Sequence, residues 1–269
     1  MAMQIHTVET DSFSMDYFRF GQGDDVFVIL PGLSVQSVMK YANAVADAYK
    51  LLSDDYTVYV FDRRKELPTD YPVHEMARDT AKAFKALGLD RVKLFGASQG
   101  GMIAMVIAIE QPELVQKLIL GSTSACVEDA RAQTIRKWVQ LAREGKAKDL
   151  YLAFGEAVYP QNVFEQSKAL LTDAAKSVSQ EDLKRFVILA ESIEGFDVRK
   201  ELKTIACPVL VIGSKDDQVL GAEASRQIAE SLNTDAELYL YDAYGHAAYD
   251  TAPDYKERIL HFLKAESAD

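Results

Sequence analysis

One serine stands between glycines in the stretch "GASQGG", with an apolar run on either side of it. A chain that passes from a buried strand into a buried helix needs no hydroxyl at the joint. Ser98 is therefore either an ordinary turn residue or a side chain presented for chemistry. The motif alone is a weak signal, but the strand pattern before it and the helical pattern after it favour the second interpretation. Gly96 and Gly100 would keep the strand and helix backbones from colliding at this turn. A serine becomes a nucleophile only when a nearby base takes its proton, so the rest of the chain must supply that base.

Four histidines could act as the base, and they are His6, His74, His246 and His261. His6 falls in an early strand pattern, His74 just after the turn "TDYP", and His261 within the last helical pattern. His246 follows a strand pattern and lies beside Gly245 in a loop that leads to a helix. Because only His246 occupies a loop of this kind, we predict that it is the partner of Ser98.

A histidine base needs a carboxylate that fixes its tautomer and stabilises the imidazolium. The stretch "GSKDD" supplies Asp216 and Asp217 just beyond an apolar strand pattern. We favour Asp216, three residues after Gly213, and interpret Asp217 as a turn or helix-capping residue. Asp242 and Asp250 flank the histidine too closely in sequence to be preferred.

Attack of a serine on a carbonyl group also requires donors for the oxyanion that develops. The backbone N–H of Gln99 is one candidate, because it opens the helix after the serine and the helix dipole favours negative charge there. The second candidate is the backbone N–H of Leu33, in the loop "PGLS" that follows another strand pattern. Pro31-Gly32 could also be an ordinary turn. A turn there is compatible with an oxyanion site, because the site would use only the backbone N–H of Leu33.

Alternating strand and helix patterns must position these residues. We expect strands at 4–10, 14–20, 26–30, 57–62, 92–97, 117–122, 209–214 and 237–242, and helices at 36–52, 76–87, 99–111, 222–232 and 255–265. The first two strands suggest a hairpin, and the later alternation predicts a parallel sheet covered by helices on both faces. Sites in such sheets lie at the carboxyl ends of the strands, where the candidate residues fall.

The alternation stops between residues 125 and 200, which contain helical patterns and no convincing strand. We predict that this insertion forms a helical cap across the carboxyl edge of the sheet. Residues 1–124 and 201–269 would then form one α/β core. Six aromatic residues of the insertion could line a pocket or simply pack within the cap, and they are Trp138, Tyr151, Phe154, Tyr159, Phe164 and Phe186.

The composition narrows the partners that this chain could have. Its formal net charge of −11 disfavours nucleic acid and stable binding to an anionic membrane, because both surfaces are negative. The sequence has neither a signal-peptide pattern nor an apolar run long enough to span a bilayer. Cys126 and Cys207 lack metal-site spacing, so we expect free thiols and a cytoplasmic location. We expect neither a metal nor an organic cofactor.

The order Ser98, Asp216, His246 resembles that of the α/β-hydrolase superfamily, and the resemblance covers nearly the whole chain. The matching features are "PGLS", "GASQGG", "GSKDD" and the late "GH" dipeptide. In layout the chain is similar to the small capped esterases and the meta-cleavage-type hydrolases. It departs from many relatives in having Pro31 where they have histidine. The resemblance implies an α/β-hydrolase fold with a mostly parallel sheet of about eight strands, flanked by helices, and a cap inserted after the sixth strand.

The resemblance also implies a carboxylesterase-like serine hydrolase that acts on a small ester or related acyl compound through an acyl-enzyme. At the strand-to-helix turn this chain has Ser98, whereas haloalkane dehalogenases and epoxide hydrolases have aspartate there, so the sequence disfavours those two chemistries. Three alternatives use the same residues. They are hydrolysis of a carbon–carbon bond, acyl transfer to an acceptor other than water, and a ligand receptor of this fold with little turnover. The sequence leaves the substrate and the oligomeric state open.

Overall fold

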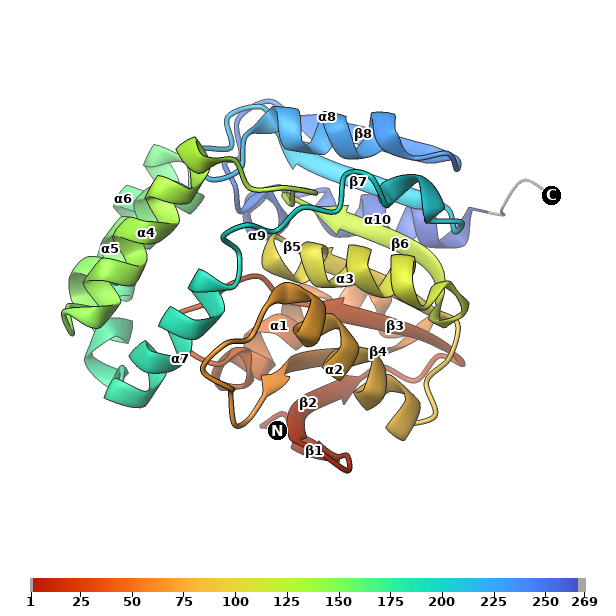
Figure 1. The fold of residues 1–269 in the computed structure, drawn as a ribbon, viewed down its shortest axis with the longest axis horizontal. Coiled ribbons are helices and arrows are strands. Elements are labelled where there is room, and N and C mark those ends of the chain that lie inside the picture. Colours follow the sequence, from red (N-terminus) through yellow and green to blue (C-terminus); the bar gives the residue numbers. More distant parts are fainter. Residues whose placement is uncertain (1, 266–269) are drawn as a thin grey trace.

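A computed structural model describes residues 2–265 as an eight-stranded sheet flanked by helices (Figure 1). The strands are β1 (Ile5–Glu9), β2 (Ser14–Phe20), β3 (Asp25–Leu30), β4 (Tyr56–Arg64), β5 (Val92–Ala97), β6 (Val115–Gly121), β7 (Val209–Ser214) and β8 (Ala236–Tyr241). Their order across the sheet is β1-β2-β4-β3-β5-β6-β7-β8. β1 pairs antiparallel with β2 and β2 antiparallel with β4, whereas the other neighbours are parallel. The predicted fold class is therefore confirmed.

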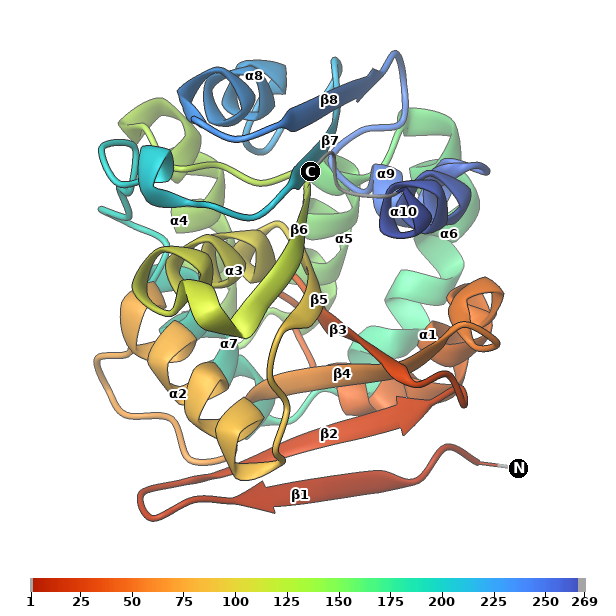
Figure 2. The same ribbon diagram turned by 90° about the vertical axis from the view of Figure 1, so that its right-hand side faces the viewer.

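Helices cover both faces of this sheet. Their bounds are α1 (Ala42–Ala48), α2 (Val73–Ala86), α3 (Gln99–Glu110), α4 (Asp129–Arg143), α5 (Ala147–Val158), α6 (Gln161–Ala174), α7 (Gln180–Glu191), α8 (Ala222–Ser231), α9 (Ala248–Thr251) and α10 (Tyr255–Lys264). Figure 2 shows α2, α3 and α8 on one face and α1 and α10 on the other. β5 and β7 are buried along their whole lengths, as expected for central parallel strands whose two faces are both covered.

The helices α4 to α7, here called the cap helices, follow β6 and precede β7. They gather at the left of Figure 1, beyond one end of the sheet. The chain enters and leaves them through two short segments that bond to each other. Val198 donates its N–H to the carbonyl of Ala125 at 2.8 Å, and Val127 donates to Phe196 at 3.1 Å. We call this pair of segments, 125–127 and 196–198, the cap stem.

Two elements differ from the sequence-based expectations. The helix expected over 36–52 is broken into a 3₁₀ turn at Val38–Tyr41, α1, and a second 3₁₀ turn at Lys50–Leu52. Ser37 caps the start of the first turn, since its hydroxyl accepts the N–H of Met39. The breaks lie at Tyr41 and Tyr49, whose φ values of −111° and −107° depart from helical geometry. The short helix α9 was not expected. Among residues 2–265 we find no helix with the length and apolar character needed to cross a bilayer.

Candidate active site

Ser98 lies at the sharp turn between β5 and α3, with φ 51° and ψ −120°. This left-handed conformation is strained for a residue with a side chain. The turn is also tight, because a Cβ built on Gly96 would lie 2.3 Å from the carbonyl oxygen of Gly100. Two hydrogen bonds hold the turn: Ser98 donates its N–H to Gly121 at 2.8 Å, and the Thr123 hydroxyl donates to the Ser98 carbonyl at 2.7 Å. The two glycines therefore let the backbone take the turn that carries Ser98.

His246 reaches this serine from the loop after β8. Its Nε2 lies 2.9 Å from the Oγ of Ser98, and the residue is only 3% exposed. Gly245 has φ +63°, which lets the chain turn just before the histidine. The loop also contacts the cap helices, because Ala247 donates its N–H to the carbonyl of Val158 at 2.9 Å. The structure thus joins two of the three residues that the sequence singled out.

The carboxylate beside His246 is that of Asp217. The prediction that Asp216 is the partner of His246 is therefore wrong. Asp217 Oδ2 lies 2.9 Å from His246 Nδ1, and both side chains are 3% exposed. The other oxygen, Oδ1, accepts the backbone N–H groups of Val219 at 2.8 Å and Leu220 at 3.0 Å. The turn-capping role that the sequence suggested for Asp217 is also present, on the oxygen that does not face the histidine.

Asp216 instead braces the loop that carries the histidine. Its Oδ1 accepts the hydroxyl of Ser214 at 2.5 Å and the N–H of Gly245 at 2.9 Å. Ser214 Oγ in turn accepts the N–H of Tyr244 at 3.1 Å. The two neighbouring aspartates therefore have different contacts: Asp217 faces the imidazole of His246, and Asp216 binds the backbone just before His246.

The surroundings of Asp217 favour its ionised form. Burial acts to raise the pKa of Asp217, but the imidazole of His246 and the three hydrogen bonds to the carboxylate outweigh it. The net result is a pKa below the ordinary value for aspartate. A carboxylate that stays charged in a buried place can stabilise positive charge on the adjoining imidazole.

The two candidate oxyanion donors come from segments that meet at Ser98. Gln99 is the first residue of α3, where the backbone N–H groups have no partner within the helix. Leu33 follows Gly32, and a Cβ built on Gly32 would lie 3.1 Å from the Cβ of Ser98. Leu33 and Ser98 line the same cavity. The roles of Leu33 and Gln99 as donors stay predictions.

Sequence reasoning missed a polar bridge that passes through the Gln99 side chain. Gln99 is fully buried, and its amide donates to the Leu189 carbonyl at 2.6 Å and the Ser192 hydroxyl at 3.1 Å. Its oxygen accepts Arg63 Nη2 at 3.1 Å, and the same nitrogen donates to the Pro31 carbonyl at 2.8 Å. Burial lowers the pKa of Arg63 to about 10. No spacing in the sequence links these positions, so no signal could have revealed them.

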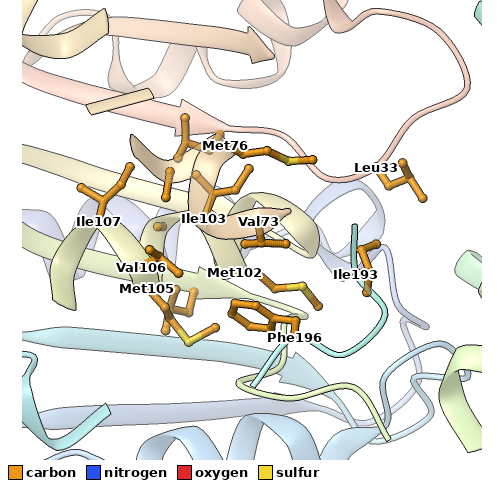
Figure 3. Close-up of a cluster of buried hydrophobic side chains, with 14 of the residues drawn as sticks. Leu33, Val73, Met76, Met102, Ile103, Met105, Val106, Ile107, Ile193 and Phe196 are labelled. Carbon is orange, nitrogen blue, oxygen red and sulfur yellow. The ribbon is translucent and has the colours of Figure 1, made fainter. Parts of the chain in front are cut away.

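A small cavity of about 20 Å³ lies over Ser98 and His246. Apolar side chains from the core and from the cap helices form the rest of its wall, and they are Leu33, Met102, Ile135, Trp138, Phe154, Val158, Ile193, Val219, Leu220 and Tyr249. Figure 3 shows the buried side chains of α2 and α3, Met102 among them, with Leu33 and Ile193 beside them in the same hydrophobic cluster. Of the six aromatic residues that the sequence offered for a pocket, Trp138 and Phe154 line this cavity. Among the described residues, no group of three or more His, Cys, Asp or Glu side chains could hold a metal ion.

Comparison with known proteins gives this geometry a family context. The family model described as "alpha/beta hydrolase fold" matches residues 25–253. The "Putative carbamate hydrolase RutD" of Pseudomonas savastanoi pv. phaseolicola is 29% identical over 82% of this chain and 89% of its own. The RutD protein of Pseudomonas syringae pv. syringae is 30% identical over 80% and 86%. The "3-oxoadipate enol-lactonase 2" of Acinetobacter baylyi is 23% identical over 79% of each chain.

Solved structures agree on the fold. MGS-M2, an alpha/beta hydrolase enzyme from a Medee basin deep-sea metagenome library, superposes with a TM-score of 0.87 and 21% identity. The superposition covers 98% of this chain and 99% of MGS-M2. The enol-lactonase of Burkholderia xenovorans LB400 gives a TM-score of 0.83 at 19% identity, over 97% of this chain and 100% of that one. The resemblance inferred from the motifs is therefore confirmed at the level of family and fold.

Proposed function

This chain belongs to the α/β-hydrolase fold family, and on that basis we propose that it is a serine hydrolase that cleaves a small ester, carbamate or related acyl compound. The observation that carries the proposal is the continuous series of contacts Ser98 Oγ–His246 Nε2 and His246 Nδ1–Asp217 Oδ2, each 2.9 Å long. A nucleophile, a base and a carboxylate that orients the base are the three parts that such chemistry requires.

In the proposed reaction, Ser98 Oγ attacks the substrate carbonyl while His246 Nε2 takes the hydroxyl proton. Asp217 holds the Nδ1 proton and stabilises the imidazolium. Collapse of the tetrahedral intermediate breaks the bond to the leaving group, which receives the proton from His246. Water then attacks the acyl-enzyme with His246 again as the base, and Ser98 is released with its proton restored.

The backbone N–H groups of Leu33 and Gln99 are proposed to bind the negative oxygen of the intermediate. The location of Gln99 at the N-terminus of α3 supports this, since the helix dipole adds positive potential there. The bridge from Arg63 to the Pro31 carbonyl and the Gln99 side chain supports it too, because it connects the segments that carry both donors. Fixed donors of this kind typically contribute about 3–4 kcal/mol to catalysis.

The substrate class rests on the cavity wall and on the relatives. The wall is mostly apolar, and among the described residues no Asp, Glu, Lys or Arg side chain lines it, so an uncharged acyl compound fits best. The relatives are named for carbamate and enol-lactone hydrolysis. In both substrates a heteroatom leaves from a carbonyl carbon, as in an ester. We therefore propose that residues 125–200 act as the cap that selects among such compounds.

A fluorophosphonate probe and a substrate panel test this proposal. We expect the probe to label the protein at Ser98, and the Ser98→Ala and His246→Ala variants to lose the label. We expect turnover of p-nitrophenyl acetate, methyl carbamate or an enol-lactone to fall by at least about 1,000-fold in Ser98→Ala. Labelling without turnover of any compound in the panel would favour a receptor. Turnover confined to a vinylogous diketone would favour carbon–carbon bond hydrolysis, and product formed only with an added alcohol would favour acyl transfer.

A further inference from the structure

The cavity over Ser98 is too small for the substrate that its chemistry requires. Its volume of about 20 Å³ approaches that of a single water molecule, whereas small-molecule sites usually span about 300–1,000 Å³. A substrate must therefore displace part of the wall. This inference rests on the proposed function, because it asks where an acyl substrate extends once its carbonyl group lies beside Ser98.

A much larger space lies on the other side of one wall residue. A groove of about 480 Å³ runs between α4 and α7, and Ile135 lines both this groove and the cavity over Ser98. Ile135 is only 6% exposed, so its side chain is buried where it borders both spaces. The groove has an apolar floor, formed by Val127, Ala132, Ile135, Val139 and Ala190.

The charges at the rim of the groove already have partners. Arg143 Nη2 lies 2.5 Å from Glu191, Arg136 lies 2.7 Å from Asp129, and Arg136 also pairs with Glu194. A charged ligand would have to compete with these ion pairs, whereas the apolar floor offers contact without such competition. The chemical class that fits the groove is therefore an uncharged hydrocarbon chain or ring.

The other parts of the cavity wall are less suited to open. Trp138 and Phe154 are in contact, with ring centroids 4.6 Å apart, and Phe186 packs behind Phe154. Leu220 also separates the cavity from a second space, but that cleft measures only about 80 Å³. The N–H of Leu220 donates to Asp217, so a shift of its backbone would disturb the proposed catalytic carboxylate.

We propose that the groove between α4 and α7 is a second substrate subsite, and that Ile135 separates it from the cavity over Ser98. A substrate with a short acyl group needs little of this space. A longer acyl chain displaces the Ile135 side chain and lies along the apolar floor of the groove. Ile135 therefore determines the chain length that the enzyme accepts.

The chain-length profile tests the subsite. We compare kcat/KM for p-nitrophenyl octanoate with that for p-nitrophenyl acetate and use the octanoate-to-acetate ratio as the readout. Ile135→Ala is expected to raise this ratio by about 10-fold or more, since a few buried methylene contacts suffice for that difference. Val139→Trp fills the groove at a position away from the cavity and is expected to lower the ratio by about 10-fold. It also provides a test should Ile135→Ala fold poorly.

Leu220→Ala is the matched control. Leu220 is buried to a similar degree as Ile135, but its truncation would extend the cavity toward the cleft of about 80 Å³ and not toward the groove. We expect its ratio to stay within about 3-fold of the original. A larger gain for octanoate in Leu220→Ala than in Ile135→Ala would overturn the proposal, as would an unchanged ratio in both Ile135→Ala and Val139→Trp. If neither ester is hydrolysed and the fluorophosphonate does not label Ser98, the proposed function fails instead.

A binding measurement separates the subsite from catalysis. Trp138 is the only tryptophan of the chain and lines the cavity, so its fluorescence reports occupancy. In a Ser98→Ala background, Ile135→Ala is expected to bind octanamide about 10-fold more tightly, with little change for acetamide. Equal gains for both amides would mean that the cavity had widened without reaching the groove, and would count against the subsite.

Discussion

The side-chain nitrogen of Gln99 donates a hydrogen bond to the carbonyl of Leu189 at 2.6 Å, so the residue that follows Ser98 is bonded directly to α7. The same residue begins α3 and offers its backbone N–H as a proposed oxyanion donor. One side chain thus couples the location of a cap helix to the geometry beside Ser98.

This bond predicts that Gln99→Ala impairs both folding stability and catalysis. The substitution removes a fully buried amide and leaves its partners Leu189 and Arg63 short of hydrogen bonds, so we expect a loss of about 1–3 kcal/mol in urea unfolding. We also expect kcat to fall more than KM rises, since the donor geometry matters most in the transition state. Gln161→Ala is the control: Gln161 is exposed on α6, away from the cavity and the groove, and its side-chain amide donates to Glu165 at 2.8 Å. Equal effects of the two substitutions would contradict the coupling.

The two neighbouring aspartates predict opposite results for the same substitution. Asp217→Asn keeps the shape but places an amide against His246 Nδ1, so we expect kcat to fall by about 1,000- to 10,000-fold. Asp216→Asn retains an acceptor for Gly245 and Ser214, so we expect a loss of less than about 10-fold. Steady-state rates on p-nitrophenyl acetate give the comparison. A deeper defect in Asp216→Asn would restore the original assignment of the acid.

The tight turn at Ser98 predicts that replacing Gly100 with alanine lowers the free energy of unfolding substantially. A Cβ there would lie 2.0 Å from the carbonyl oxygen of Leu30, which is backbone and cannot swing aside. We therefore expect Gly100→Ala to destabilise the fold by more than about 3 kcal/mol, measured by urea unfolding. Gly88→Ala isolates the conformational cost, because Gly88 has φ +68° but open space around it, and should lose only about 1–2 kcal/mol. Similar losses at both glycines would show that crowding at the turn is unimportant.

The thiol of Cys207 predicts a steep pH dependence of alkylation. Burial raises the pKa of Cys207 from its usual value to about 11, because the uncharged thiol is favoured over the thiolate. Only the thiolate reacts, so iodoacetamide labelling of the folded protein at pH 8 should be slow and should accelerate as the pH rises toward 11. Peptide mapping by mass spectrometry follows Cys207 separately from Cys126. Protein unfolded in urea supplies the reference, and equally fast labelling of the folded form at pH 8 would refute the prediction.

Most of the fold could be predicted from the sequence because its signals are local. Apolar runs such as 26–30 and 209–214, bounded by turn residues, are typical of strands buried on both faces, and they form β3 and β7. The serine between glycines and the histidine after the last strand were also found correctly as neighbours, since their places at the carboxyl edge follow from strand order.

The features that were predicted wrongly or missed depend on how segments meet in space, which a local sequence pattern does not contain. Asp216 and Asp217 both follow β7, and only the turn after that strand decides which carboxylate faces His246. The helix expected over 36–52 is interrupted at Tyr41 and Tyr49, where the backbone departs from helical geometry, and the apolar spacing that favours a continuous helix does not reveal such single-residue departures. The bridge from Arg63 through Gln99 to Leu189 joins three distant segments and leaves no spacing to read.

The cap stem has a consequence for how this architecture can diversify. Residues 125–127 and 196–198 bond to each other, and the strands on either side of the insertion, β6 and β7, are direct neighbours in the sheet. The intervening polypeptide can therefore lengthen, shorten or be exchanged without disturbing strand register. A change in this insertion would reach the framework through bonds such as Gln99 to Leu189 and Ala247 to Val158, which end beside Ser98 and His246.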